Sequence, residues 1–285
     1  YHWLKEDNPE LFYQLQQLEH PTLCKKILLG THADIADSFY LMERTHFLYS
    51  AVSGWYVLME NNQWSCVGSK DVLDIPAILN RIRCVCSKVV VSMMNGLIPS
   101  EVEEYDTVFK AGKDVLKKLA THGFLKGVAN MLQGHYYREG VDARWNANRD
   151  LFAFSNGVID LSSGAFRPIE PDDFVTITCG YPYRDVGVEE KAMVREFLGR
   201  IFPRESVLSY VIAALARCLS GENSEQWFHV FTGMGANGKS CLMDLCKLVF
   251  GDYYQTFSVS YLTKEMKSKD QPLPELAAAQ YSRML

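Results

Sequence analysis

The sequence lacks a hydrophobic run long enough to cross a membrane. Its longest uncharged stretch of interest, Val89 to Pro99, is about half the length that a bilayer requires, and it contains Asn95 and Gly96. No charged segment followed by a short apolar run stands at the start of the chain, so we expect no secretory signal peptide. These absences predict an intracellular protein without a membrane partner.

Cysteine arrangements typical of metal sites or disulfide scaffolds are also missing. The eight cysteines lie at positions 24, 66, 84, 86, 179, 218, 241 and 246, with no CxxC pair and no zinc-type Cys/His spacing. Scattered cysteines in a chain of 285 residues favour reduced thiols. We expect Cys84 and Cys86 to point the same way from a strand, but without further ligands they do not predict a metal.

The chain has no excess of positive charge. Its 29 Lys and Arg against 34 Asp and Glu give a net charge of −5, so binding of nucleic acid needs a local basic patch or an oligomeric channel. Hydrophobic residues make up 48% of the chain and charged residues 22%, which excludes disorder, collagen and coiled coil as the main architecture. The length predicts about two domains.

Apolar periodicities predict a mixed α/β fold. Helical spacing occurs at about 8–18, 31–44, 100–119, 194–201 and 208–219, and the third of these begins with a capping box of Ser100 and Glu103. Alternating residues and turn signals predict strands at 47–49, 55–58, 151–155, 158–161 and 174–178. We expect Asn156-Gly157 to form a type I′ turn between two of them, because both residues accept positive φ angles.

A loose domain boundary is expected between Tyr183 and Glu190, where charge and glycine replace the strand pattern. We therefore predict an α+β domain over residues 1–185, a helical segment over 190–221, and part of a further domain over 222–285. The chain starts with Tyr1 and stops at Leu285, and we expect it to be a fragment of a longer protein.

The most specific motif is a phosphate-binding loop at residues 233–240, whose sequence GMGANGKS satisfies GxxxxGK[ST]. An expected buried strand at 226–231 precedes it, and a helix with Leu242, Leu245, Cys246 and Val249 on one face follows and ends at Gly251. Glycines at 233, 235 and 238 let such a loop curl so that backbone N–H groups point at phosphate oxygens. The start of the helix adds its positive dipole end.

Each residue of the loop has an expected role. The nucleotide-binding residues are predicted to be Gly233, Gly235, Ala236, Asn237, Gly238, Lys239, Ser240 and Cys241. Lys239 is the catalytic candidate because its ammonium can reach the β- and γ-phosphates, and the Ser240 hydroxyl can ligate Mg²⁺. The expected cofactors are ATP and Mg²⁺. Metabolic kinases, AAA-type remodellers and helicases share this loop, so the motif alone leaves the class open.

The sequence around the loop resembles superfamily 3 helicases, specifically the poxvirus-type primase-helicases of large DNA viruses and their phage relatives. The likeness rests on Gly233-x-Gly235-x-Asn237-Gly238-Lys239-Ser240, the leader from Gly221 to Phe228, Gly251-Asp252-Tyr253 after the loop helix, and Pro274 to Ala277 with Arg283. Upstream, Asn156 to Leu161 with Gly164 resembles the hairpin that ends the family's pre-helicase domain, and Trp55 and Trp64 resemble its start, less specifically.

The resemblance implies an ATP-driven DNA helicase of viral or phage genome replication, hexameric in its complete form. The implied fold is an α+β pre-helicase domain, a helical segment and a truncated P-loop AAA+-like ATPase domain. The implied partners are DNA, further copies of the chain, a primase domain and replication factors, in the host cytoplasm or nucleus. The family's catalytic carboxylates, sensor and arginine finger lie downstream of the position that matches Arg283, so this chain alone is expected to bind ATP without hydrolysing it.

Two alternatives stay open from the sequence. One is a nucleotide-binding assembly or scaffold module without helicase activity, and the other is a small-molecule kinase, which would leave the long region before the loop without a use.

A weaker signal for DNA binding lies between positions 110 and 149, where eight basic residues stand against three acids. Lys110, Lys113, Lys117 and Arg144 are the DNA-binding candidates, because basic residues interleaved with aromatic ones suit a nucleic-acid surface. A solvated helix face is the alternative, and the one that we favour. We expect Asp160 to stabilise its turn, and His229 and Trp227 to pack in the core before the loop.

Overall fold

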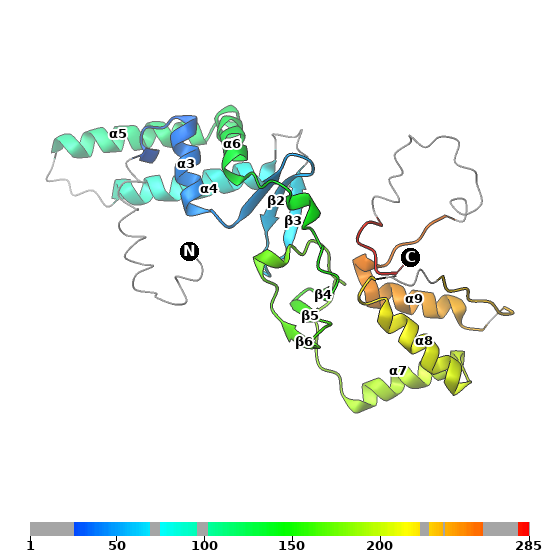
Figure 1. The fold of residues 1–285 in the computed structure, drawn as a ribbon. Coiled ribbons are helices and arrows are strands. Elements are labelled where there is room, and N and C mark those ends of the chain that lie inside the picture. The colour runs from blue at the N-terminus through cyan, green and yellow to red at the C-terminus, as the bar shows by residue number, and fades with distance from the viewer. Residues whose placement is uncertain are drawn as a thin grey trace, which may run out of the picture. The chain divides into compact units, whose positions relative to one another are not determined.

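The computed structural model describes residues 26–68, 75–95, 102–222, 228–235, 237–258 and 279–284. The helix expected at 8–18 and the side chains of the expected capping box at Ser100 and Glu103 lie outside the described part. The chain forms two compact units, one from residues 1–58 and 65–142 and the other from 59–64 and 143–285. Helices and small sheets occur together (Figure 1), which confirms the mixed α/β class and an α+β arrangement.

The first unit is built mainly from helices α3 (His32–Met42), α4 (Pro76–Asn95), α5 (Val102–Leu119) and α6 (His122–Tyr136). The helices expected at 31–44 and 100–119 are confirmed, and the Thr31 hydroxyl caps α3 by accepting a hydrogen bond from Asp34 N at 3.2 Å. Fully buried side chains from these helices form the core, among them Ile35, Phe39, Ile82, Leu125 and Leu132. Burial of these apolar side chains is the main stabilisation of this unit.

Cys84 and Cys86 lie on helix α4, so the expectation of a strand at this place is wrong. Two positions along a helix rotate a side chain by about 200°. The thiols therefore point to different sides, with Cys84 exposed and Cys86 buried. Burial raises the pKa of Cys86 to about 12. Among the described residues, no group of three or more His, Cys, Asp or Glu side chains could hold a metal ion.

A three-stranded sheet completes the first unit, with β1 (Phe47–Ser50), β2 (Gly54–Leu58) and β3 (Trp64–Gly68) in that order. Strands β1 and β2 are antiparallel, and Phe47 lies opposite Val57. Both strands were predicted from their alternating residues. A turn precedes Trp64, with Asn62 at a φ of 61°.

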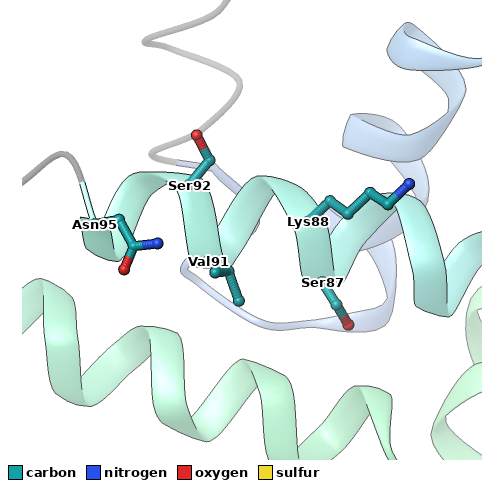
Figure 2. A pocket seen from close by; sticks show the side chains of 5 residues that line it. All are labelled: Ser87, Lys88, Val91, Ser92 and Asn95. Carbon is teal, nitrogen blue, oxygen red and sulfur yellow. The ribbon is translucent and has the colours of Figure 1, made fainter.

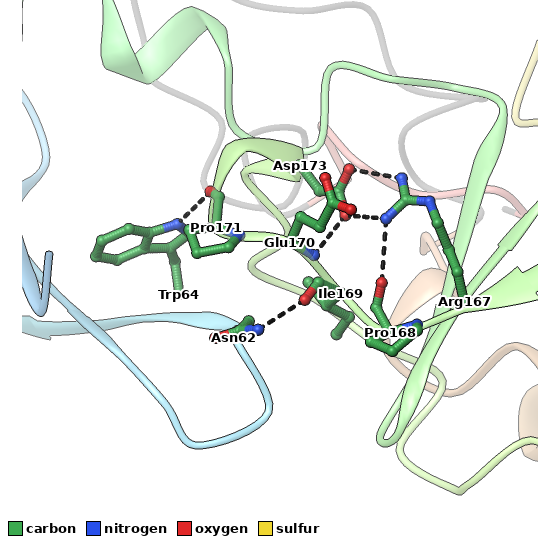
Figure 3. Close-up of polar contacts among 8 residues, drawn as sticks. All are labelled: Asn62, Trp64, Arg167, Pro168, Ile169, Glu170, Pro171 and Asp173. Carbon is green, nitrogen blue, oxygen red and sulfur yellow. Dashed lines mark hydrogen bonds and ion pairs between the residues drawn. The ribbon is translucent and has the colours of Figure 1, made fainter. Parts of the chain in front are cut away.

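The turn between β2 and β3 belongs to the second unit, where its side chains bind backbone carbonyl groups. Asn62 Nδ2 donates to Ile169 O at 2.8 Å and Trp64 Nε1 donates to Pro171 O at 2.8 Å (Figure 3). Trp64 N also donates to Val175 O at 2.8 Å. These bonds satisfy a buried indole and fix the turn. Their acceptors lie more than a hundred residues away and have no signal in the sequence.

The short helix η2 (Pro171–Asp173) is itself held by a bidentate ion pair. Arg167 Nη1 and Nη2 each lie 2.7 Å from an oxygen of Asp173, and Glu170 N donates to the same carboxylate at 2.8 Å (Figure 3). The hydrogen bond to Asp173 raises the pKa of Arg167. The arrangement keeps Pro171 O in place as the acceptor for Trp64.

The second unit contains the expected hairpin, formed by β4 (Leu151–Phe154) and β5 (Gly157–Asp160). The predicted type I′ turn is wrong, because Phe154 pairs with Gly157 and neither Asn156 nor Gly157 has a positive φ. Glycine is needed at 157 for space instead, since a Cβ there would lie 2.5 Å from Arg167 O. That carbonyl belongs to a third strand, β6 (Ala165–Arg167), which was too short and exposed to leave a sequence pattern.

Residues 174–178 do not form the expected strand. Phe174 has a φ of 51°, which interrupts the extended chain at its start. The Asn146 side-chain oxygen accepts hydrogen bonds from Thr176 N at 2.8 Å and Ile177 N at 3.3 Å. A side chain thus satisfies N–H groups that a neighbouring strand would otherwise bind, which is why apolar alternation was misleading here.

Three helices complete the second unit: α7 (Val188–Ile201), α8 (Glu205–Arg217) and α9 (Lys239–Phe250), with the short helix η3 (Gly251–Tyr253). The short helix η1 (Val141–Ala143) begins at the end of the first unit. The helical patterns at 194–201 and 208–219 are confirmed, although Val194 is 53% exposed rather than buried. Leu198, Leu208, Leu242 and Phe250 share one core with Phe152 of the hairpin. Within the described part of the chain, no helix combines the length and apolar character needed to cross a bilayer.

Candidate nucleotide-binding site

The glycine-rich loop runs directly into α9, as the motif predicts. Gly238 is the N-cap residue with a φ of 82°, a left-handed conformation that favours glycine. The first intrahelical bond runs from Leu242 N to Gly238 O at 2.9 Å. The N–H groups of Lys239, Ser240 and Cys241 therefore lie before that bond, at the positive end of the helix dipole.

The segment before the loop is not the buried strand that its sequence predicted. Residues 228–235 have no strand assignment, and Phe228 and Val230 are 78% and 69% exposed. The strands of the described residues all belong to the two three-stranded sheets, so this segment has no ladder to join. His229 is exposed, with Nδ1 3.3 Å from the Tyr210 hydroxyl, so its expected core position is wrong. Trp227 and Ala236 lie outside the described residues.

The ammonium group of Lys239 lies inside the curl of the loop. Its Nζ donates to Gly233 O at 3.1 Å, to Met234 O at 3.4 Å and to Asn237 Oδ1 at 2.7 Å. The side chain of Lys239 is thus folded back over the residues that precede it. The structure brings the two ends of the predicted motif, Gly233 and Lys239, into direct contact.

The three glycines of the loop differ in what they provide. Of these, Gly238 alone has a positive φ. A Cβ at Gly238 would lie 2.8 Å from the Ile201 side chain, so glycine also lets the start of α9 approach the end of α7. A Cβ at Gly233 would lie 2.1 Å from Asn237 Nδ2, whereas Gly235 has open space around it. The structure thus gives a further reason for glycine at 233, which makes room for a side chain.

The chemistry of the loop fits a phosphate group with a bound divalent ion. Ser240 and Cys241 are exposed at the first turn of α9, with the Ser240 hydroxyl available as an oxygen ligand. Residues 228–241 contain no Asp or Glu, so no carboxylate in this segment repels an anion. The donors on offer are the Lys239 ammonium and the N–H groups of the helix start.

The far end of α9 is anchored in the second unit by η3. The Tyr253 hydroxyl donates to Ile177 O at 3.1 Å and accepts from Ala153 N at 3.3 Å, and its ring lies 4.8 Å from that of Phe152. Gly251 sits against the backbone of Cys179, where a Cβ would be only 2.2 Å from the carbonyl oxygen. The expected end of the helix at Gly251 is confirmed, and it is a packing position as well as a cap.

Arg283 is the most deeply buried guanidinium among the described residues, at 8% exposure. It donates to the carbonyl oxygens of Arg149 at 2.7 Å, Leu151 at 2.9 Å and Leu219 at 3.1 Å, and to that of Ser220. It therefore joins the start of β4 to the residues that follow α8. The sequence motif marked Arg283, but its partners are far away in the sequence and could not be read from it.

Asp160 stabilises its turn, as expected. Its carboxylate accepts hydrogen bonds from Ser162 N at 2.9 Å, from the Ser162 hydroxyl at 2.6 Å and from Ser163 N at 3.3 Å. The hydroxyl of Ser162 contributes most to lowering the pKa of Asp160. These contacts account for the residue without a catalytic role.

The DNA-binding candidates fall into two groups. Lys110, Lys113 and Lys117 share helix α5 of the first unit, whereas Arg144 lies in the second unit and stacks 3.8 Å above the Phe174 ring. On α5, Lys113 Nζ lies 4.5 Å from the Phe109 ring centre and Lys117 Nζ lies 3.6 Å from Asp114. The three lysines share one helix, while Arg144 has a local packing role.

An open depression lies along α4 of the first unit (Figure 2). It is lined by Ser87, Lys88, Val91, Ser92 and Asn95. These side chains offer hydroxyl and amide groups with a single positive charge. They contain no acid–base pair or activated nucleophile, so the depression is not a candidate catalytic site.

Comparison with known proteins identifies the relatives of this chain. Residues 36–203 match the family described as D5 N-terminal-like. A protein of Acanthamoeba polyphaga mimivirus with a provisional helicase name is 30% identical over 97% of this chain and 29% of its own length. A protein of Invertebrate iridescent virus 6, also provisionally named a helicase, is 27% identical over 59% of the chain and 18% of its own length. An African swine fever virus protein with a provisional primase name is 23% identical over 59% of the chain and 18% of its own length.

The match to the family covers more than half of the chain, and it includes the hairpin and α7. The chain spans less than a third of the length of each of these relatives. These findings confirm the resemblance seen in the sequence. The chain therefore belongs to the D5 N-terminal-like family, within the primase-helicases of large DNA viruses.

Proposed function

We propose that the chain is the pre-helicase region and the beginning of the ATPase domain of a superfamily 3 DNA helicase that acts in viral genome replication. The loop at 233–240 binds ATP with Mg²⁺. In the complete protein, hydrolysis of that ATP drives movement along DNA. The complete protein is a ring of six copies, and it works inside the infected cell, in the cytoplasm or the nucleus.

The observation that supports this proposal most is the position of the Lys239 ammonium inside the curl of a glycine-rich loop at the start of a helix. A bound phosphate would meet the ammonium and the free N–H groups of the helix start together. The names of the viral relatives support helicase work in DNA replication over other uses of the same loop.

Within this site the residues divide the work as follows. Lys239 would hold the β- and γ-phosphates by neutralising their charge, and the Ser240 hydroxyl would be a ligand of the Mg²⁺ that accompanies the nucleotide. Gly238 lets the helix start approach the phosphates closely. When bound, ATP·Mg supplies the reactive phosphoanhydride, and the residues that activate water come from other parts of the complete protein.

The test replaces Lys239 with alanine in the complete protein. Loss of the ammonium should lower the rate of ATP hydrolysis at least a hundredfold, because it removes the charge that stabilises the transferring phosphoryl group. Strand separation should be lost with it. The control is Lys247→Ala, an exposed lysine in the last turn of the same helix, which should leave both activities unchanged.

The outcomes separate the competing functions. ATP hydrolysis and unwinding at wild-type rates in Lys239→Ala would overturn the assignment of the loop. An assembly or scaffold module would be favoured by two results together. The complete protein would bind nucleotide in a manner that depends on Lys239, and DNA would not stimulate its ATP hydrolysis. Transfer of phosphate to a metabolite would favour the kinase.

DNA binding by the first unit is the second part of the proposal. Its candidates are Lys110, Lys113 and Lys117, which repeat at three and four positions and therefore lie on neighbouring turns of α5, with a solvated helix face as the competing interpretation. Arg144 is left out because its guanidinium is stacked on Phe174.

A further inference from the structure

The Lys239 ammonium has three N–H donors and makes three hydrogen bonds within its own loop. Two acceptors, Gly233 O and Met234 O, are backbone carbonyl oxygens at 3.1 and 3.4 Å. The third and shortest contact, at 2.7 Å, is to a side chain, Asn237 Oδ1. The loop therefore satisfies its lysine completely before any phosphate arrives.

The amide of Asn237 lies across the loop. Its oxygen faces Lys239 Nζ, and its nitrogen lies so near Gly233 that a Cβ on the glycine would be 2.1 Å away. A larger residue at 233 would push the amide out of this position. Gly233 thus leaves the space for the Asn237 amide, and the uncharged oxygen of that amide contacts the ammonium.

We propose that Asn237 is a positioning residue that aims the Lys239 ammonium at the bound phosphates. This inference rests on the proposed function of the loop. When nucleotide binds, the two longer contacts to carbonyl oxygens are exchanged for phosphate oxygens, and the short contact to Asn237 is kept. The lysine then presents two of its three donors to the phosphates, while the third fixes its direction.

The neutral charge of the amide matters to this role. A carboxylate at position 237 would hold the ammonium more strongly and would also repel the phosphates. Asparagine provides an acceptor without that repulsion. The absence of Asp and Glu from residues 228–241 is consistent with this requirement.

The experiment uses the complete protein and measures binding of a fluorescent ATP analogue together with steady-state hydrolysis. Asn237→Ala should weaken nucleotide binding about tenfold, the effect of one hydrogen bond to a charged group, and should also lower kcat. Asn237→Asp should weaken binding more than Asn237→Ala does. The control is the same substitution at an asparagine outside the loop: Asn80→Ala, on an exposed position of α4, should bind nucleotide normally.

A double-mutant comparison distinguishes positioning of Lys239 from general support of the loop. In a Lys239→Ala background, Asn237→Ala should cause no further loss of nucleotide affinity, because its target is gone. An equal loss in both backgrounds would overturn the inference, as would normal binding and kcat in Asn237→Ala. If the wild-type protein binds no nucleotide, the proposed function itself fails, and if Lys239→Ala weakens binding while Asn237→Ala does not, only this inference fails.

Discussion

Single buried polar side chains hold the second unit together at points that apolar packing cannot reach. Arg283 donates hydrogen bonds to carbonyl oxygens of two segments, at Arg149 and Leu151 and at Leu219. The Tyr253 hydroxyl joins Ala153 N of the hairpin to Ile177 O. Desolvation by burial lowers the pKa of Arg283, although the guanidinium stays charged. Because buried polar groups without a hydrogen-bond partner are costly, the loss of either side chain should lower the free energy of unfolding markedly.

Arg283→Ala should lower the free energy of unfolding by about 3 kcal/mol, because it leaves several carbonyl oxygens buried without donors. Urea denaturation followed by circular dichroism measures this change. Arg184→Ala is the matched control, since Arg184 is 75% exposed in its ion pair with Glu190 and its removal should change stability by less than about 0.5 kcal/mol. If the two substitutions lowered the free energy of unfolding equally, the hydrogen bonds of Arg283 would not have the structural role given to them here.

Tyr253→Phe should destabilise the protein by about 1–3 kcal/mol at neutral pH, because Ala153 N and Ile177 O lose their partner. Burial raises the pKa of Tyr253 to about 12, above the value of about 10 in the unfolded chain. The hydroxyl therefore contributes fully below pH 10, and its contribution falls as the pH rises from about 10 to 12.

The difference in unfolding free energy between the wild type and Tyr253→Phe should accordingly narrow across that alkaline range. Urea denaturation at a series of pH values measures it. Tyr137→Phe, at a tyrosine that is 44% exposed, should show neither the loss nor the narrowing. A constant difference from pH 7 to 12 would contradict the role assigned to burial of Tyr253.

Among the elements, the hairpin shows how a glycine can be right for a reason other than its φ angle. Gly157 has an ordinary φ and is required by the close approach of β6. Gly134, in contrast, lies inside α6 with nothing within 4 Å of the position that a Cβ would take. The same substitution should therefore have opposite effects at the two sites.

Gly157→Ala should destabilise the protein by about 1–3 kcal/mol, because the new methyl group forces β5 and β6 apart. Gly134→Ala should stabilise it by about 0.5–1 kcal/mol, because alanine loses less entropy in a helix interior. Thermal unfolding of the two variants beside the wild type measures both. Shifts of the same sign would contradict the packing around Gly157.

Most of the elements predicted from the sequence have local hydrogen bonds, although helices α4 and α6 were not among them. Helices α3, α5, α8 and α9 satisfy their own backbone, so their apolar period of three to four residues sufficed. The segments at 174–178 and 228–231 have apolar alternation but depend on partners elsewhere, and neither is a strand. Strand β6, with three residues, left no pattern at all.

In the candidate site, too, the local part could be predicted from the sequence and the long-range contacts could not. The loop from Gly233 to Ser240 is a continuous motif, so its residues could be named in advance, and α9 follows where the motif requires it. The contact of Ile201 with Gly238 and of Cys179 with Gly251 joins segments that are distant in the chain. No local pattern encodes such contacts, because they depend on how α7 and the chain at 179 pack against α9.

On the scale of the whole chain, the net charge of −5 means that the proposed DNA binding needs a local arrangement of cations. The three lysines of α5 offer such an arrangement, although the charge of Lys117 is partly neutralised by its ion pair with Asp114. Each phosphate contact made by a lysine releases counterions, and the salt dependence of binding counts such contacts. Two variants that lose the same number of positive charges at different places can therefore distinguish DNA contacts made by α5 from general electrostatic attraction.

In the complete protein, replacing Lys110, Lys113 and Lys117 together by glutamine should weaken binding of single-stranded DNA. It should also flatten the slope of log affinity against log salt by about two, since each single-strand contact contributes about 0.7. The control triple replaces Lys88, Lys191 and Lys247, exposed lysines outside α5, and removes the same three positive charges. Fluorescence anisotropy at several salt concentrations measures both proteins. If the two triples weaken binding equally and leave the same slope, α5 is a solvated helix face, and the DNA contacts must be sought elsewhere in the protein.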